Sequence, residues 1–230
     1  MDVDIKNLYK DYGDRRVLQI DSLNFTKGNI YTIIGLNGSG KTTLLECIAG
    51  LIKPSGGEIT YEGLSIERAR NNISLMCQKA YLFNDSVINN IKCGLKFKGF
   101  SENVIEGRIN KYINYFSLEH ILEKNAKRLS GGEASKVAML RTAVLQTELI
   151  LFDEPTASMD IESTLKAEKL IKDMKSKDRT IIIITHDLQQ AKRVADYVIF
   201  MDKGVIIEMG EKEKVLNNPE NKLVKLILNI

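Results

Sequence analysis

The 230-residue chain is 43% hydrophobic and 27% charged, the balance of an ordinary soluble protein, which excludes a collagen-like or disordered chain. Its 33 Lys and Arg against 30 Asp and Glu leave a net charge of +3 without a dominant basic block, so the composition does not require a nucleic-acid partner. The length fits one large α/β domain, or one domain with an insertion. The three cysteines, Cys47, Cys77 and Cys93, include no CxxC pair, which argues against a disulfide framework or a zinc site.

The chain begins without the positive and apolar regions of a signal peptide. Its longest apolar runs, residues 149–152 and 181–184, are far shorter than the roughly 20 residues that span a bilayer. We therefore expect a cytoplasmic protein that reaches a membrane only through a partner.

The predicted elements begin with two strands, residues 3–8 and 17–25, which flank a turn-like stretch and indicate an antiparallel hairpin. Further along, short Ile-rich runs lack the alternation of half-exposed strands, which indicates strands buried on both faces. These runs are residues 30–34, 149–152, 181–184 and 197–201. Helical segments alternate with them at residues 41–49, 130–146, 161–175 and 188–194. This alternation predicts an α/β fold with a parallel sheet covered by helices.

Residues 86–128 have helical spacing and no buried-strand pattern, so we predict a helical insertion within the α/β core. Apolar residues recur there at helical intervals: Ile105, Ile109, Tyr112, Ile113 and Phe116. The tail, residues 211–230, is predicted to form two short helices. Pro219 is expected to open the second, because proline is favoured at the first helical position.

The sequence Gly-Leu-Asn-Gly-Ser-Gly-Lys-Thr at residues 35–42 matches the P-loop pattern G-x-x-x-x-G-K-[ST]. It follows a predicted strand and leads into a predicted helix, which is the context that the motif requires. Glycines let the loop curl so that backbone N–H groups point at phosphate oxygens, and the helix adds its positive N-terminal end. Lys41 supplies a cation for the β- and γ-phosphates, and the Thr42 hydroxyl is placed to ligate Mg²⁺. The pattern predicts a nucleoside triphosphate site.

Two adjacent carboxylates, Asp153 and Glu154, follow the predicted strand 149–152. At a strand tip, Asp153 can hold Mg²⁺ directly or through water, and Glu154 is suited to polarise an attacking water. By itself an acidic pair after a strand is ordinary loop chemistry. Its combination with the phosphate loop favours hydrolysis of the triphosphate.

Leu-Ser-Gly-Gly-Glu at residues 129–133 has the features of a helix N-terminus, with Ser130 as N-cap and Glu133 completing a capping box. The string resembles the LSGGQ signature of ABC-type ATPases, with Glu133 where glutamine is more common. Further strings occur in the order of that family: Walker A at 35–42, Walker B at 149–154 and a D-loop, Ala-Ser-Met-Asp, at 157–160. The chain therefore resembles a complete ABC ATP-binding subunit: a P-loop NTPase core with a parallel sheet, an N-terminal antiparallel β subdomain and a helical insertion subdomain.

The resemblance implies ATP and Mg²⁺ as cofactors. The residues that it implies for nucleotide binding are Tyr12, which would stack on adenine, Gly35, Leu36, Asn37, Gly38, Ser39, Gly40, Lys41, Thr42, Thr43, Ser130, Gly131, Gly132, Glu133 and Asp160. The implied metal ligands are Thr42, Gln78 and Asp153. The implied catalytic residues are Glu154 as general base, His186 and Lys41 at the γ-phosphate, and Gln78 as the Q-loop glutamine.

The resemblance also implies a single ATP-binding domain over residues 1–230. Its ATPase core, with the antiparallel part, would be residues 1–85 and 145–230, and its helical subdomain, with the signature helix, 86–144. It further implies a head-to-tail homodimer with ATP at the interface. A γ-phosphate can bridge the phosphate loop of one subunit and the signature helix of the other only when the subunits close.

Residues 78–87, 90–91 and 94–95 resemble the corresponding region of bacterial uptake systems, most of all those for oxyanions such as tungstate, molybdate or phosphate. This predicts the energising subunit of a membrane importer, held on the inner face of the cell membrane by a permease. A solute-binding protein outside the cytoplasm would be an indirect partner, and no nucleic acid is expected. Tyr81, Leu82 and Phe83 would either line a groove for a permease helix or fill the protein's own core.

Several other functions stay open at this point. The chain could serve an amino-acid importer or an exporter, or it could be a soluble ABC ATPase of the iron–sulfur assembly type. A P-loop kinase for small molecules is disfavoured, because it would leave the signature and D-loop strings without a role.

Overall fold

The structure is a computed structural model and describes residues 1–229, so that Ile230, the last residue of the predicted domain, lies outside the described residues. The chain divides into two compact units, which are described separately. The core unit comprises Met1–Ser74, Thr147–Asp153 and Lys175–Ile230. The helical unit comprises Leu75–Gln146 and Glu154–Met174. The grouping of Glu154–Met174 with the helices adds a second chain segment to the helical part.

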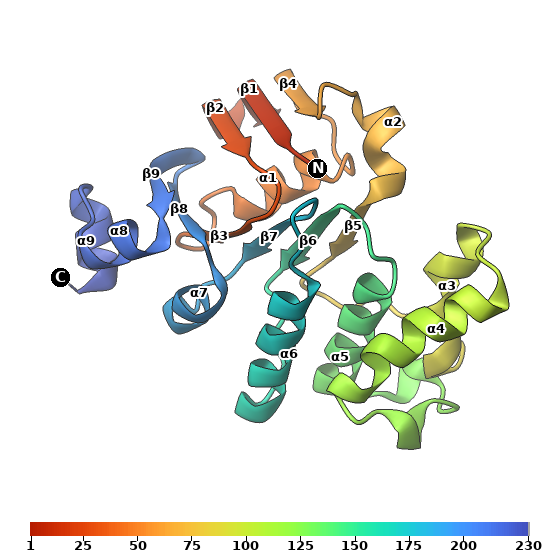
Figure 1. Cartoon of the computed structure of the whole chain (residues 1–230). Coiled ribbons are helices and arrows are strands. Elements are labelled where there is room, and N and C mark those ends of the chain that lie inside the picture. The colour runs from red at the N-terminus through yellow and green to blue at the C-terminus, as the bar shows by residue number, and fades with distance from the viewer. Residues whose placement is uncertain (230) are drawn as a thin grey trace. The chain divides into compact units, whose positions relative to one another are not determined.

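The first sheet of the core unit is antiparallel, with the strand order β2-β1-β4 (Figure 1). Its strands are β1 (Val3–Tyr12), β2 (Arg15–Phe25) and β4 (Gly56–Tyr61). The hairpin is longer than the sequence pattern predicts, because pairing continues from Val3↔Phe25 to Tyr12↔Arg15. Its two-residue turn contains Gly13 at φ 59°, a conformation that glycine adopts without steric cost.

The second sheet has the strand order β5-β6-β7-β3-β8-β9. Its strands are β3 (Ile30–Ile34), β5 (Ile73–Met76), β6 (Leu149–Asp153), β7 (Thr180–Ile184), β8 (Tyr197–Asp202) and β9 (Val205–Glu211). Every residue of β3, β6 and β7 is buried, and these strands pair in parallel, which confirms the interpretation of the Ile-rich runs. The α/β fold that the sequence predicts is thus confirmed.

Helix α1 (Lys41–Ile48) contacts strand β2 of the first sheet and strand β6 of the second (Figure 1). The other helices of the core unit are α2 (Ile66–Ala69), α7 (Leu188–Val194), α8 (Lys212–Asn217) and α9 (Lys222–Leu228), with a 3-10 turn, η1 (Arg70–Asn72). The tail forms two short helices as predicted, but Pro219 does not open the second. Asn221 caps α9 instead, because its side chain accepts the backbone N–H of Leu223 at 2.8 Å.

The helical unit contains α3 (Val87–Phe97), α4 (Glu102–Tyr112), α5 (Gly131–Ala143) and α6 (Ile161–Met174). Helix α3 contacts α4 and α5, and α5 contacts α6. Between α4 and α5 lie only short 3-10 turns, η2 (Ile113–Tyr115), η3 (Glu119–Ile121) and η4 (Ala126–Arg128). The predicted helical character of residues 86–128 therefore holds most fully for α3 and α4. No helix in residues 1–229 is long and apolar enough to cross a membrane.

The hydroxyl of Thr32 is a buried polar group in the middle of β3, and Oγ1 has no hydrogen-bond partner among the described residues. Thr32→Val removes this hydroxyl and keeps the branched shape of the side chain. We expect the free energy of unfolding to rise by about 1 kcal/mol, because a buried unpaired hydroxyl costs about 1–3 kcal/mol. Denaturant unfolding of the purified protein measures the change.

Thr180→Val on the neighbouring strand β7 is the matched control. Thr180 is equally buried, but its Oγ1 donates to the Met1 carbonyl at 2.6 Å. This substitution should lower the free energy of unfolding by about 1 kcal/mol. Equal losses in both variants would contradict the assignment of Thr32 as an unpaired group.

Candidate nucleotide-binding site

The phosphate loop connects β3 to α1, and glycine is required at two of its positions for different reasons. At Gly35, a Cβ atom would lie 2.2 Å from the carbonyl oxygen of Met201 on β8, so the chain approaches too closely for any side chain. At Gly40, which is the N-cap of α1, φ is 96° and a Cβ would lie 3.0 Å from the Val17 carbonyl oxygen. Both glycines allow the loop to curl tightly at the start of the helix.

The Lys41 ammonium lies inside this curl. Nζ donates to the carbonyl oxygens of Gly35 at 2.8 Å and Leu36 at 3.0 Å, and it also lies 3.4 Å from Ser39 Oγ. Lys41 is only 7% exposed, whereas Leu36, Asn37 and Gly38 at the loop tip are exposed. A positive charge is thus held at the centre of the loop, where the N-terminal end of α1 also favours an anion.

Thr42 and Asp153 are brought together at the same loop. Thr42 Oγ1 donates to Asp153 Oδ2 at 3.0 Å, and Asp153 is the buried last residue of β6. A hydroxyl and a carboxylate are hard oxygen donors, and Mg²⁺ is usually bound by one or two such groups together with substrate phosphates. These two residues therefore fit Mg²⁺. Among residues 1–229 there is no group of three or more His, Cys, Asp and Glu that could hold a metal ion.

The parallel register places His186 at the same edge of the sheet. Asp153 pairs with Ile184, and Ile33 pairs with Ile184 from the other side, so the residues that follow β3, β6 and β7 share one edge. His186 follows β7 and is exposed. Hydrogen bonds hold its turn, because Thr185 Oγ1 accepts the Asp187 N–H at 3.0 Å and Asp187 caps α7.

The other predicted nucleotide contacts of the core unit lie close in sequence to these groups or on the hairpin. Thr43 is half-buried in the first turn of α1. Tyr12 ends β1 and is 51% exposed, with the Lys10 ammonium 5.1 Å from its ring centroid. The available ring surface is what adenine stacking needs.

In the helical unit, Gln78 and Glu154 are brought together although 75 residues separate them in the sequence. Gln78 Nε2 donates to Glu154 Oε2 at 3.2 Å. Glu154 has φ 46°, a left-handed conformation that costs a non-glycine residue energy and that concentrates at functional sites. Gln78 belongs to the helical unit and Thr42 to the core unit. The contact that the structure gives for Gln78 is therefore the one to Glu154, within its own unit.

The signature string begins helix α5 with the predicted capping box. Ser130 Oγ accepts the Glu133 N–H at 3.3 Å, and Glu133 Oε2 accepts the Ser130 N–H at 2.8 Å. This backbone N–H, together with the Ser130 hydroxyl, holds the pKa of the Glu133 carboxyl below its usual value. A Cβ on Gly132 would lie 3.0 Å from the Ser158 carbonyl oxygen, so the D-loop runs against the signature glycines.

Asp160, the last residue of the D-loop, is exposed and precedes α6. Its Oδ1 accepts the Ser163 N–H at 2.7 Å, and this bond lowers the pKa of its carboxyl. Gly131 is also exposed, next to Ser130. The signature and D-loop residues thus form one cluster at the N-terminal ends of α5 and α6.

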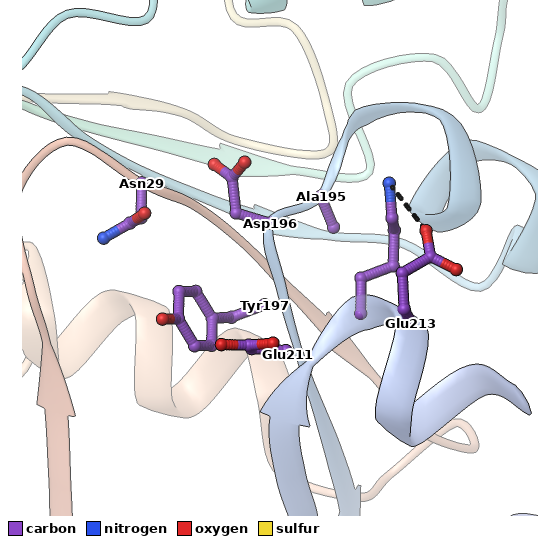
Figure 2. Close-up of a pocket in the computed structure, with 7 residues that line it drawn as sticks. Asn29, Ala195, Asp196, Tyr197, Glu211 and Glu213 are labelled. Carbon is purple, nitrogen blue, oxygen red and sulfur yellow. Dashed lines mark ion pairs between the residues drawn. The ribbon is translucent and has the colours of Figure 1, made fainter. Parts of the chain in front are cut away.

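A pocket elsewhere on the core unit lies away from these groups. It is lined by Asn29, Ala195, Asp196, Tyr197, Glu211, Lys212 and Glu213 (Figure 2). Asn29 precedes β3 and Tyr197 begins β8, so the pocket lies at the amino end of strands whose carboxyl ends carry the phosphate loop. Ligands of parallel sheets bind at the carboxyl ends. The Asp196 carboxylate is already bonded to the Ile30 N–H and the Lys175 ammonium.

Comparison with known proteins agrees with this geometry. The family model described as ABC transporter matches residues 18–157, more than half of the chain. The chain belongs to the ABC transporter family. It is an ATP-binding cassette that hydrolyses ATP, as the resemblance of its motifs predicts.

Three curated relatives match this cassette over nearly its whole length. The tungstate uptake system ATP-binding protein TupC of Peptoclostridium acidaminophilum is 38% identical over 90% of this chain and 98% of its own. The phosphate import ATP-binding protein PstB 2 of Aliivibrio fischeri is 32% identical, over 96% of this chain and 87% of its own. The L-cystine import ATP-binding protein TcyC of Bacillus subtilis is 30% identical, over 98% and 96%.

A solved structure also resembles the cassette. It is a dimeric ATP-binding cassette in a post-hydrolysis state, bound to ADP and Pi. The TM-score is 0.83 at 25% identity, over 91% of this chain and 98% of that one.

Sequence reasoning missed two contacts of the cassette. The hydrogen bond between Gln78 and Glu154 joins distant segments, and each residue was singled out by itself. The approach of Gly35 to Met201 depends on the neighbouring strand β8. Contacts between distant segments leave no local pattern in a sequence. A prediction that β3 and β8 are neighbours would have suggested the contact between Gly35 and Met201.

Lys41→Ala should weaken ATP binding by about tenfold or more, because the ammonium is a charge-assisted donor for phosphate oxygens. Titration with a fluorescent ATP analogue measures the affinity. Lys27→Ala is the control, since Lys27 is exposed in the same unit and paired with Glu62 at 2.9 Å. Unchanged affinity in Lys41→Ala, with the fold intact by circular dichroism, would contradict a phosphate-binding role of the loop.

Proposed function

We propose that this cassette energises a bacterial membrane importer of a small oxyanion such as tungstate, molybdate or phosphate. The observation that carries the proposal is the 38% identity, along almost the full length of both chains, to an ATP-binding protein named for tungstate uptake. The relative named for phosphate import is 32% identical, and the one named for L-cystine import is 30% identical. The higher identity supports tungstate or a similar oxyanion ahead of an amino acid.

In this proposal ATP binds with its phosphates in the loop, against the Lys41 ammonium and the loop amides. Tyr12 stacks on the adenine. Thr42 and Asp153 hold Mg²⁺, with Gln78 as a further ligand through its amide oxygen. The metal, when bound, neutralises charge that develops on the phosphates. The position of the Lys41 ammonium supports this assignment, because hydrogen bonds to the Gly35 and Leu36 carbonyl oxygens hold the cation at the centre of the loop.

Hydrolysis requires a positioned water, and Glu154 is proposed as its general base. Two features support this role. Glu154 directly follows the buried strand β6 and has a left-handed backbone conformation. Gln78 donates a hydrogen bond to one oxygen of its carboxylate. Gln78 thereby fixes the carboxylate, while its own position depends on the segment that follows β5. His186, at the end of the adjacent strand β7, is proposed to stabilise the γ-phosphate.

The cassette is proposed to work as a head-to-tail homodimer. In this arrangement the N-terminal end of α5, with the Ser130 hydroxyl and the amides of Gly131 and Gly132, would serve as an anion site for the partner subunit. A γ-phosphate in the loop of one subunit would be bound by this site of the partner, and Asp160 would contact the partner across the interface. The solved cassette of similar fold is dimeric, which supports a dimer.

The permease is proposed to contact the segment before α3. Tyr81 and Phe83 are 67% and 58% exposed and are available to line a groove, whereas Leu82 is buried and fits the other alternative, a place in the protein's own core. The buried Asn90 fixes the backbone here, since its side chain accepts the Phe83 N–H at 2.7 Å and donates to the Phe83 carbonyl. The partner would hold the cassette on the cytoplasmic face of the membrane, with a solute-binding protein on the other side.

Glu154→Gln should keep ATP binding, lower turnover by about 10²-fold and accumulate an ATP-bound dimer, because the amide cannot accept a proton. Phosphate release and light scattering after size-exclusion chromatography measure both effects. Glu106→Gln on the exposed side of α4 is the control, and it should behave as the parent. Full turnover of Glu154→Gln would refute the base assignment.

Purification from membranes with a tag on this chain should recover a multi-span permease, and ATP hydrolysis of the reconstituted complex should rise with tungstate or molybdate and the cognate solute-binding protein. A double Tyr81→Ala, Phe83→Ala variant should lose the permease and keep ATP binding. Stimulation by L-cystine alone would replace the oxyanion with an amino acid. Recovery of no membrane protein, with full ATPase activity in solution, would overturn the transport proposal.

A further inference from the structure

The Ser130 hydroxyl, which is proposed to bind the γ-phosphate of the partner subunit, already has a partner in its own helix. Ser130 Oγ donates to Glu133 Oε2 at 2.9 Å, and the Ser130 N–H donates to the same oxygen at 2.8 Å. One carboxylate oxygen of Glu133 therefore accepts hydrogen bonds from both the hydroxyl and the backbone N–H of Ser130, at the N-terminal end of α5. A phosphate bound here would compete with Glu133 for the proton of the Ser130 hydroxyl.

The carboxylate also changes the charge of this anion site. The positive end of a helix attracts phosphate through its unpaired N–H groups and its dipole. Glu133 lies in the first turn, and like an ordinary glutamate it is ionised at neutral pH. The Lys124 ammonium also lowers the pKa of this carboxyl, but it contributes less than the Ser130 hydrogen bonds. A bound phosphate would thus lie beside a fixed negative charge.

We propose that Glu133 is a positioning residue that acts through Ser130 and weakens the ATP-bound dimer. A phosphate can accept the Ser130 hydroxyl only after the serine releases Glu133, and the carboxylate then repels the phosphate at close range. This inference rests on the proposed head-to-tail dimer. As a consequence, the closed dimer forms less tightly and opens more readily than it would without the Glu133 carboxylate.

Glu133→Gln separates this effect from the structural one. The glutamine amide oxygen can still accept the Ser130 N–H, so the cap of α5 is retained while the charge is removed. We expect the melting temperature to fall by at most about 4 °C, since the capping hydrogen bonds survive and only the attraction of the first-turn charge to the helix end is lost. A role limited to helix capping would therefore leave the dimer unchanged.

The experiment measures the dissociation constant of the ATP-bound dimer by sedimentation, in a Glu154→Gln background in which hydrolysis is slow. Adding Glu133→Gln should lower that constant by about tenfold, because a repulsive contact of about 1.4 kcal/mol corresponds to that factor. Adding Glu106→Gln, an exposed charge on α4, should leave it unchanged. A Ser130→Ala, Glu133→Gln pair completes a double-mutant cycle, in which the gain from Glu133→Gln should shrink when the hydroxyl is absent.

Each outcome has a distinct meaning. An equal or larger dissociation constant with Glu133→Gln, in a protein that dimerises with ATP, would overturn the role of Glu133 and leave the dimer proposal intact. An equal gain with Ser130→Ala would overturn the action through Ser130. If Ser130→Arg does not prevent dimerisation, or if Glu154→Gln never dimerises with ATP, the head-to-tail arrangement itself fails, and this inference fails with it.

Discussion

Burial of three adjacent parallel strands determines where the charged groups of the core unit can lie. Strands β3, β6 and β7 are buried along their whole length, so none of their own side chains can carry an exposed charge. Polar chemistry is possible only where a strand ends. Because the strands run in parallel, their ends meet at one edge, where Asp153 is the last residue of β6 and the phosphate loop and His186 follow β3 and β7. The register of the buried strands thus brings together groups that are far apart in the sequence.

The contact between Lys41 and the loop carbonyls follows from this arrangement. The loop must turn back from β3 into α1 within a few residues, and it passes so close to β8 that only glycine fits at Gly35. The turn directs carbonyl oxygens inward, and the Lys41 ammonium bonds to two of them. The loop therefore holds its curled shape through its own lysine, which lowers the ordering cost when an anion binds.

Much of this fold was predictable because its strands depart from alternation. The runs at 30–34 and 181–184 are rich in isoleucine and lack an alternating polar face, and the glycine motif begins directly after the first of them, at Gly35. Strand β9 was missed because Val205–Glu211 mixes Gly and Glu with apolar residues and is only half-buried, at the sheet edge where pairing needs no hydrophobic run. Strand β4 was missed for a similar reason, since it begins with two glycines. The role of Pro219 was wrong because a local preference for the first helical position yielded to the cap that Asn221 supplies.

In the candidate site, too, features formed by consecutive residues could be predicted from the sequence, whereas contacts between distant segments could not. The loop, the acidic pair and the capping box could be located from the sequence, because each depends on a few consecutive residues. The hydrogen bond from Gln78 to Glu154 could not, since it depends on where the chain returns after α5. Leu82 shows the same limit, because three neighbouring apolar residues look alike in sequence while only Tyr81 and Phe83 are exposed. Local patterns identify the candidate groups, and packing decides which of them face a ligand or a partner.

The signature helix differs from the phosphate loop in how it treats an anion. The loop keeps the Lys41 ammonium at its centre, whereas the start of α5 bonds its serine to the Glu133 carboxylate. In the proposed head-to-tail dimer, this difference would let each subunit keep its nucleotide while the two subunits separate. A stronger contact between the γ-phosphate and the signature helix would stabilise the closed dimer. It would also slow its opening, because that contact must break before the subunits separate. On this reasoning the acidic residue of the signature favours opening at the expense of the closed dimer, and the loop of each subunit retains its hold on the nucleotide.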